Sequence, residues 1–178
     1  GTKSFIRGVP LWGSLIAVAD QSAVLAGAAF FPALDELVVA AVGEGAWWNG
    51  ARCCVSDIAN LADATITTTD ERFSDYPARR ECWRTLASRV SVSRSWGDCF
   101  GYFMVATGRA EVMCDPVLSV WDAAPFLPII SEAGGIFTDW EGQVSSRGGN
   151  AIATNARLAT SVRSLLDCPA DILSGEKP

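Results

Sequence analysis

The segment from Ser119 to Gly135 constrains the fold more than any other part of the chain. It reads Ser-Val-Trp-Asp-Ala-Ala-Pro-Phe-Leu-Pro-Ile-Ile-Ser-Glu-Ala-Gly-Gly. Ser119 is suited to cap a helix, and the apolar run that follows ends at a glycine pair, a usual helix stop. Asp122 then lies in the first helical turn. Pro125 and Pro128 each remove a backbone donor, and we expect a kink at Pro128.

Two interpretations of Asp122 follow from this position. Free backbone N–H groups and the positive end of the helix dipole favour an ionised carboxylate, which is the form that a hard cation requires. The same charge also stabilises an ordinary helix without binding anything. The residues alone favour this second interpretation, a buried helix with an aspartate in its first turn.

The composition indicates a globular protein of about one domain. A chain of 178 residues is long enough to bury roughly 70% of its unfolded surface. The net charge of −6, without a Lys/Arg cluster, argues against a nucleic-acid partner. No apolar run reaches the length of a membrane span and no signal peptide is recognisable, so we expect no membrane partner and a cytoplasmic location.

The cysteine and histidine content limits the possible chemistry. The six cysteines show no zinc-binding spacing and are expected to be reduced core residues. The chain contains no histidine, which excludes Ser-His and Cys-His nucleophilic machinery within it. Any hydrolysis would therefore depend on carboxylates, hydroxyl groups and water activated by a metal ion.

The apolar pattern predicts two regions. In residues 1–60, strands are expected at Leu11 to Val18, Ala23 to Phe31 and Glu36 to Val42, followed by a hairpin at 45–50 with an Asn-Gly turn. In residues 61–178, strands alternate with helices, which is typical of an α/β domain with a largely parallel sheet. The last helix is expected to start at Asn155, a good capping residue.

The central segment resembles a known family. Trp121-Asp122-Ala-Ala, a short apolar run and Glu-Ala-Gly-Gly are similar to the second signature of the inositol monophosphatase superfamily of magnesium-dependent phosphatases. The resemblance implies Mg²⁺ as cofactor and Asp122 as a metal ligand. It also implies an α+β fold, the layered αβαβα sandwich, of which this chain would form the C-terminal portion with mixed sheets and flanking helices.

The start of the chain resembles the end of the first signature of the same superfamily. Gly1-Thr2, Phe5 and Gly8-Val9-Pro10 match it, while the two aspartates and an upstream glutamate that bind metal in the family have no counterpart. By resemblance, Gly1 and Thr2 bind phosphate, and Thr2 is catalytic because its hydroxyl orients the attacking water. We expect the chain to be a fragment, or the missing part to lie on another polypeptide.

The segment Arg94 to Tyr102 has two interpretations as well. It reads Arg-Ser-Trp-Gly-Asp-Cys-Phe-Gly-Tyr, and its residues alone favour a helix start with Asp98 as a first-turn anion. By resemblance, Gly97, Asp98 and Cys99 line the substrate's leaving group, and the motif is similar to the histidinol-phosphatase branch. Asp115 is a plain turn residue on its own, and by resemblance it contacts the substrate.

The resemblance favours a histidinol-phosphate phosphatase of histidine biosynthesis, because Asp98 and Asp115 suit a substrate that carries an ammonium group. A broad-specificity inositol or sugar monophosphatase is the alternative in the same class. A non-catalytic truncated domain with a packing role is the alternative from another class. Superfamily members commonly form homodimers, so the resemblance also implies a homodimer acting on a small phosphorylated substrate.

Overall fold

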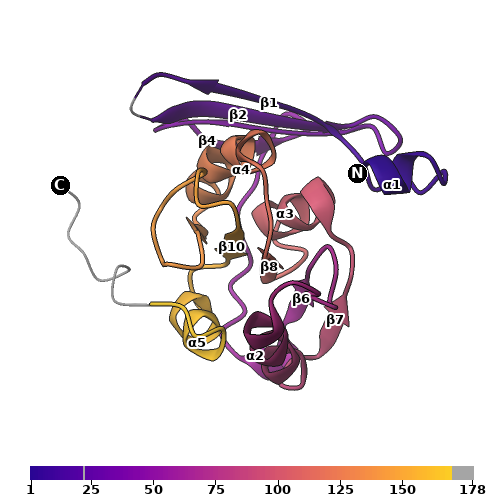
Figure 1. The fold of residues 1–178 in the computed structure, drawn as a ribbon. Helices are drawn as coiled ribbons and strands as arrows, with labels where there is room; N and C mark the ends of the chain where they lie inside the picture. The colour runs from indigo at the N-terminus through magenta and orange to yellow at the C-terminus, as the bar shows by residue number, and fades with distance from the viewer. Residues whose placement is uncertain (22, 170–178) are drawn as a thin grey trace.

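The computed structural model describes residues 1–21 and 23–169, so the last nine positions of the predicted 61–178 domain lie outside the described residues. The described residues form two five-stranded sheets and flanking helices, stacked in layers (Figure 1). One sheet lies over helices α3 and α4, and the second sheet lies between these helices and the pair α2 and α5. The expected α+β fold with layered sheets and helices is confirmed.

The first sheet is an antiparallel meander in which each strand pairs with the next. Its strands are β1 (Ser14–Ala19), β2 (Val24–Phe31), β3 (Glu36–Ala41), β4 (Gly45–Trp48) and β5 (Ala51–Arg52). Asn49 and Gly50 join β4 to β5 with positive φ angles of 47° and 82°. This two-residue turn is the one that the Asn-Gly pair favours. The three predicted strands and the hairpin are therefore present.

The two faces of the first sheet have different environments. Ala29, Phe31 and Val38 are fully buried on the face that packs on α4. On the opposite face Ile16 and Val18 are 65% and 56% exposed, and within the described part of the chain no helix covers them. The apolar sequence of these strands is thus suited to a sheet that is covered on both faces, although the described residues cover only one of them.

The second sheet has the strand order β7-β6-β8-β10-β9. Its strands are β6 (Thr65–Thr67), β7 (Val92–Arg94), β8 (Val112–Asp115), β9 (Ile136–Thr138) and β10 (Ala151–Thr154). β6 is parallel to β7 and β8, while β10 is antiparallel to β8 and β9. The expectation of a largely parallel sheet is wrong, because β9 and β10 follow each other without an intervening helix and pair as antiparallel neighbours.

Both faces of the second sheet are buried. In β8, Met113 packs into the core with α3 and α4, whereas Val112 and Cys114 pack into the core with α2 and α5. β10 alternates in the same way at Ala151, Ile152 and Ala153. This period of two explains why these strands read as continuous apolar runs.

The described helices include the two that the sequence predicts around Asp98 and Asp122. The described helices are α1 (Thr2–Phe5), α2 (Pro77–Ala87), α3 (Asp98–Ala106), α4 (Val120–Glu132) and α5 (Ala159–Leu165), with a 3₁₀ turn at Leu61–Asp63. Helix α4 continues through Pro125 and Pro128. Helix α5 starts four residues after Asn155, because the Asn155 side chain accepts a hydrogen bond from Leu158 N and closes a separate turn. Among the helices described, none has the length and apolarity needed to cross a bilayer.

Candidate active site

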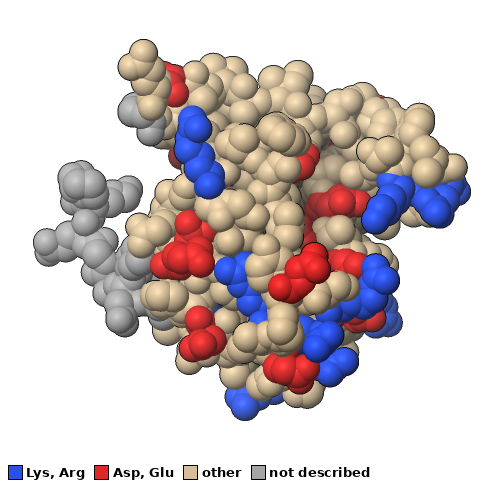
Figure 2. Space-filling view, in the orientation of Figure 1, with Lys and Arg blue, Asp and Glu red and all other residues tan. Residues whose placement is uncertain are grey.

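A cleft lies where the carboxyl ends of β6 and β8 meet the N-termini of α3 and α4. It consists of two adjoining cavities of about 380 and about 620 Å³, and Gly1, Thr69 and Asp98 line both. Figure 2 shows acidic atoms inside the groove between the first sheet and the rest of the molecule. Ligands of open α/β sheets bind beyond the carboxyl ends of the strands. The cleft is therefore the candidate active site.

The structure brings all the predicted site residues to this cleft. The smaller cavity is lined by Gly1, Asp98, Cys99, Asp115 and Asp122, and the larger one by Gly1, Thr2, Gly97 and Asp98. They come from the start of the chain, the start of α3, the end of β8 and the first turn of α4. The placement agrees with a common site, while the role of each residue remains a prediction.

Gly97 is required by a close approach between two loops. A Cβ atom at this position would lie 2.1 Å from Cα of Thr69 and 2.6 Å from the carbonyl oxygen of Thr68. Both are backbone atoms, which cannot move aside as a side chain can. Gly97 therefore allows the start of α3 to lie directly against the segment that follows β6.

Asp98 begins α3 in an unusual backbone conformation. Its φ is +51°, in the left-handed region that non-glycine residues seldom adopt. Its backbone N–H donates a hydrogen bond of 2.8 Å to Thr69 Oγ1, which holds this conformation. The carboxylate stays about one third exposed, with Oδ2 at 3.5 Å from the nitrogen of Gly1. Asp98 thus presents a solvent-accessible negative charge to both cavities.

Asp115 is the buried carboxylate of the site, with 2% of its surface exposed. Oδ1 accepts a hydrogen bond from Thr69 N at 3.0 Å, and Oδ2 accepts one from the Tyr102 hydroxyl at 3.2 Å. Burial raises its pKa to about 6, although the hydrogen bonds from Thr69 and Tyr102 act in the opposite direction. Asp115 therefore changes its charge near neutral pH.

Asp122 lies in the first turn of α4 and lines the smaller cavity. Partial burial raises the pKa of its carboxyl above the usual value. Ser119 is the N-cap residue, and Asp122 N donates to its carbonyl oxygen at 3.0 Å. Across residues 1–21 and 23–169, no three His, Cys, Asp or Glu side chains come close enough to hold a metal ion. Asp122 is suited to be one ligand, but the described residues do not complete a metal site.

Cys99 faces the smaller cavity as a protonated thiol. Burial is the main cause that raises its pKa to about 11, and the nearby Asp98 carboxylate acts in the same direction. A thiol needs to be ionised to act as a nucleophile or metal ligand. Cys99 is therefore a neutral lining residue at physiological pH.

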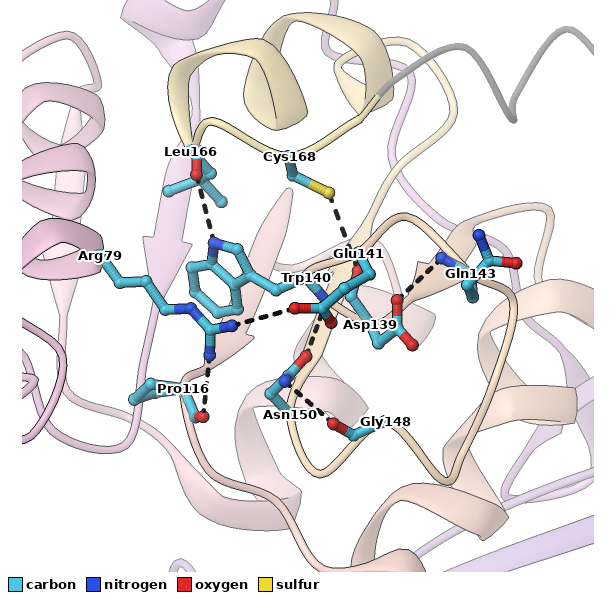
Figure 3. Close-up of polar contacts among 10 residues, drawn as sticks. All are labelled: Arg79, Pro116, Asp139, Trp140, Glu141, Gln143, Gly148, Asn150, Leu166 and Cys168. Atoms are coloured by element: carbon cyan, nitrogen blue, oxygen red, sulfur yellow. Dashed lines mark hydrogen bonds and ion pairs between the residues drawn. The ribbon is translucent and has the colours of Figure 1, made fainter.

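Pro116, which follows Asp115, is held by contacts from α2 and from the connection between β9 and β10 (Figure 3). The Arg79 guanidinium lies 4.7 Å from the ring centre of Trp140 and donates a hydrogen bond of 3.3 Å to the Pro116 carbonyl. Trp140 is itself fixed, because its indole N–H donates to Leu166 O and its backbone N–H donates to Asn150. The α2 helix and the β9–β10 connection thus support the backbone that carries Asp115.

Two residues of the site were missed in the sequence. Thr69 lines both cavities and links Asp98 to Asp115, and Tyr102 donates to Asp115 from a buried position. Thr69 follows the end of β6, so a correct strand order would have placed it at the ligand-binding edge. Tyr102 lies four residues after Asp98, which places both on one face of α3.

The chain that forms this cleft is similar to known proteins. A model of the inositol monophosphatase family matches residues 1–168. The chain belongs to the inositol monophosphatase family. The matched range includes both sheets and every residue that lines the cleft.

Named relatives of this family member include two histidinol-phosphatases. The one from Chlorobaculum parvum is 40% identical over 154 residues, which cover 86% of this chain and 60% of the relative. The one from Mycobacterium tuberculosis is 37% identical over 172 residues, which cover 94% of this chain and 66% of the relative. The chain thus spans less than two thirds of the length of these curated relatives.

Solved structures share the fold. The extragenic suppressor protein suhB from Bartonella henselae aligns with a TM-score of 0.87 and 32% identity, over 93% of this chain and 65% of that protein. The layered arrangement of sheets and helices in this chain is therefore shared with that structure.

Proposed function

We propose that this protein is a Mg²⁺-dependent phosphatase of phosphate monoesters, with histidinol phosphate as its substrate. One observation supports this substrate most directly. Asp98, Asp115 and Asp122 all line the smaller cavity, and none of the described residues that line it is Lys or Arg. A cavity of this charge attracts an ammonium group as well as a metal ion, whereas a neutral polyol does not require it.

The phosphate end of the substrate would lie in the region around Gly1 and Thr2. Backbone N–H groups aimed at an anion are the usual way in which proteins bind phosphate oxygens. Asp122 is proposed as one carboxylate ligand of Mg²⁺, an ion that would neutralise phosphate charge and lower the pKa of a bound water. Asp98 and Asp115 are proposed to accept hydrogen bonds from the ammonium and hydroxyl groups at the other end, beside Gly97 and Cys99.

The proposed reaction is direct hydrolysis. A water molecule oriented by the Thr2 hydroxyl attacks phosphorus, a new P–O bond forms, and the ester P–O bond breaks. One proton of the attacking water ends on the leaving oxygen, so the products are the alcohol and inorganic phosphate. A covalent intermediate on Cys99 is excluded from the proposal, because the raised pKa keeps this thiol protonated at neutral pH.

The oligomeric state, the location in the cell and the pathway are proposed as well. By family resemblance, the protein acts as a homodimer in the cytoplasm and takes part in histidine biosynthesis. Size-exclusion chromatography with light scattering measures the oligomeric state, and a monomer at micromolar concentration would contradict the proposed homodimer.

Phosphate release from L-histidinol phosphate by the full-length protein, with Mg²⁺ and with a chelator, tests the proposed function. We expect turnover that requires Mg²⁺ and a kcat/KM that exceeds the value for inositol 1-phosphate. A preference for inositol 1-phosphate would contradict the assigned substrate. Asp122→Asn is expected to abolish Mg²⁺-dependent turnover, with a loss of about a thousandfold or more. Unchanged activity of this variant would contradict the role of Asp122.

A further inference from the structure

Tyr102 connects α3, β8 and α4, the three elements that present Asp98, Asp115 and Asp122 to the cleft. It lies on α3, one helical turn after Asp98, and 1% of its surface is exposed. Its hydroxyl donates to Asp115 Oδ2 at 3.2 Å. Tyr102 itself does not line either cavity. It therefore contacts Asp115 but does not reach the space that a substrate would occupy.

The ring of Tyr102 is fixed by aromatic packing. It stacks on Phe126 with ring centres 5.1 Å apart, and it packs against Phe137 at 5.9 Å. Phe126 lies one turn after Asp122 on α4. Because ring positions in a close-packed core have little freedom, the hydroxyl has one defined location relative to α3 and α4.

The bonding of Asp115 leaves room for an external donor. Each carboxylate oxygen has two lone pairs, and the protein supplies donors from the backbone and the side chain of Thr69 and from the Tyr102 hydroxyl, which leaves one lone pair for an external donor. The Tyr102 hydroxyl stays protonated, since burial and the Asp115 charge raise its pKa well above the usual value. Other titratable groups that act on this pair are Asp98, Cys114 and Asp122.

We propose that Tyr102 is a positioning residue for substrate recognition, which holds the Asp115 carboxylate in the orientation that accepts a hydrogen bond from the substrate's ammonium group. This inference rests on the proposed function. Without the hydroxyl, Oδ2 would lose its donor, and the buried carboxylate would be held by Thr69 alone. Tyr102 also favours the ionised form of Asp115, the form that attracts a cation.

Tyr102→Phe in the full-length enzyme tests the inference, because it removes the hydroxyl and keeps the ring. We expect KM for histidinol phosphate to rise about tenfold, with kcat within about twofold, since a hydrogen bond to a charged group is lost. The acid limb of the kcat/KM profile should move to higher pH by about half a unit or more. Inhibition by inorganic phosphate should be unchanged, because its proposed contacts lie at Gly1 and Thr2.

Tyr76→Phe is the matched control. Tyr76 is the other tyrosine of the chain, and its ring is 36% exposed and packs on Arg79. The control should retain wild-type KM and pH profile. If Tyr102→Phe behaves like the control in both measurements, the inference is wrong.

A double-mutant cycle with Asp115→Asn separates positioning from general stability. Tyr102→Phe should raise KM in the wild-type background and have an effect below about twofold in the Asp115→Asn background. Equal effects in both backgrounds would show a merely structural role and overturn the inference.

Failure of the proposed substrate and failure of the positioning role of Tyr102 can be told apart. Wild-type enzyme that hydrolyses inositol 1-phosphate but not histidinol phosphate would overturn the proposed substrate. The same cycle is then run with inositol 1-phosphate, whose hydroxyl groups would donate to Asp115. Coupling between Tyr102 and Asp115 would support the positioning role, and independent effects would overturn it.

Discussion

The two sheets of this protein are both rich in apolar residues, but their surroundings differ. The second sheet is covered by helices on both faces, and its strand ends hold the buried Asp115. The first sheet is covered on one face by α4, and its other face presents Ile16 and Val18 to solvent in the described structure. Asp115 needs the doubly covered sheet, because burial raises its pKa and the donors from Thr69 and Tyr102 define its orientation.

Helix α4 joins the two regions. At its C-terminal end, both carboxylate oxygens of Glu132 accept hydrogen bonds from the turn between β3 and β4, from Gly43 N at 2.9 Å and from Gly45 N at 2.7 Å. At its N-terminal end the helix presents Asp122 to the cleft. One helix thus fixes the first sheet as a wall of the cleft and places a candidate metal ligand.

A pair of isoleucine substitutions measures the difference between the sheets directly. Ile66→Ala in β6 should lower the free energy of unfolding by about 2 to 5 kcal/mol, because this side chain is fully buried. Ile16→Ala in β1 should cost about 1 kcal/mol or less, since this side chain is 65% exposed. Urea unfolding gives both values. A cost at Ile16 equal to that at Ile66 would show that the outer face is covered in the protein.

A pair of glycine substitutions compares the regions in function. A Cβ at Gly97 would lie 2.1 Å from Thr69 Cα, and one at Gly27 would lie 2.1 Å from the Pro125 carbonyl oxygen. Gly97→Ala should lower kcat/KM about a hundredfold, since a shift of about 1 Å misplaces Asp98. Gly27→Ala should mainly lower the melting temperature and leave the activity of the folded enzyme within about tenfold. Equal losses of activity would show that the contact of the first sheet with α4 matters for catalysis as much as the start of α3 does.

Asp115 gives the smallest expected effect, a dependence of stability on pH. Its pKa is about 6 in the folded protein, above the ordinary value of 3.8, so the folded state binds the proton more tightly. This contribution is therefore favourable below pH 4 and is lost as the pH rises to about 6, by about 1 to 3 kcal/mol. Asp115→Asn should remove this slope from unfolding curves measured between pH 4 and pH 7. Parallel curves for the variant and the wild type would contradict the assigned pKa.

Much of the fold could be predicted from local patterns. The Asn-Gly hairpin and the extent of α4 depend on neighbouring residues, and the structure contains both. The mixed second sheet could not be predicted in this way. Its strand order depends on which strands meet after folding, and the helix-free connection from β9 to β10 reverses the direction that alternating helices suggest.

By itself, the sequence determined the residue types of the site and the spacing of its motifs, including Asp122 at the start of a helix and Gly97-Asp98-Cys99 at the start of another. Tertiary structure decided that these segments share a cleft with Gly1 and Asp115. It also decided that Thr69 and Tyr102 hold Asp115. The physical reason is that hydrogen bonds between residues far apart in the chain, and the burial that shifts a pKa, exist only after the sheets and helices have packed.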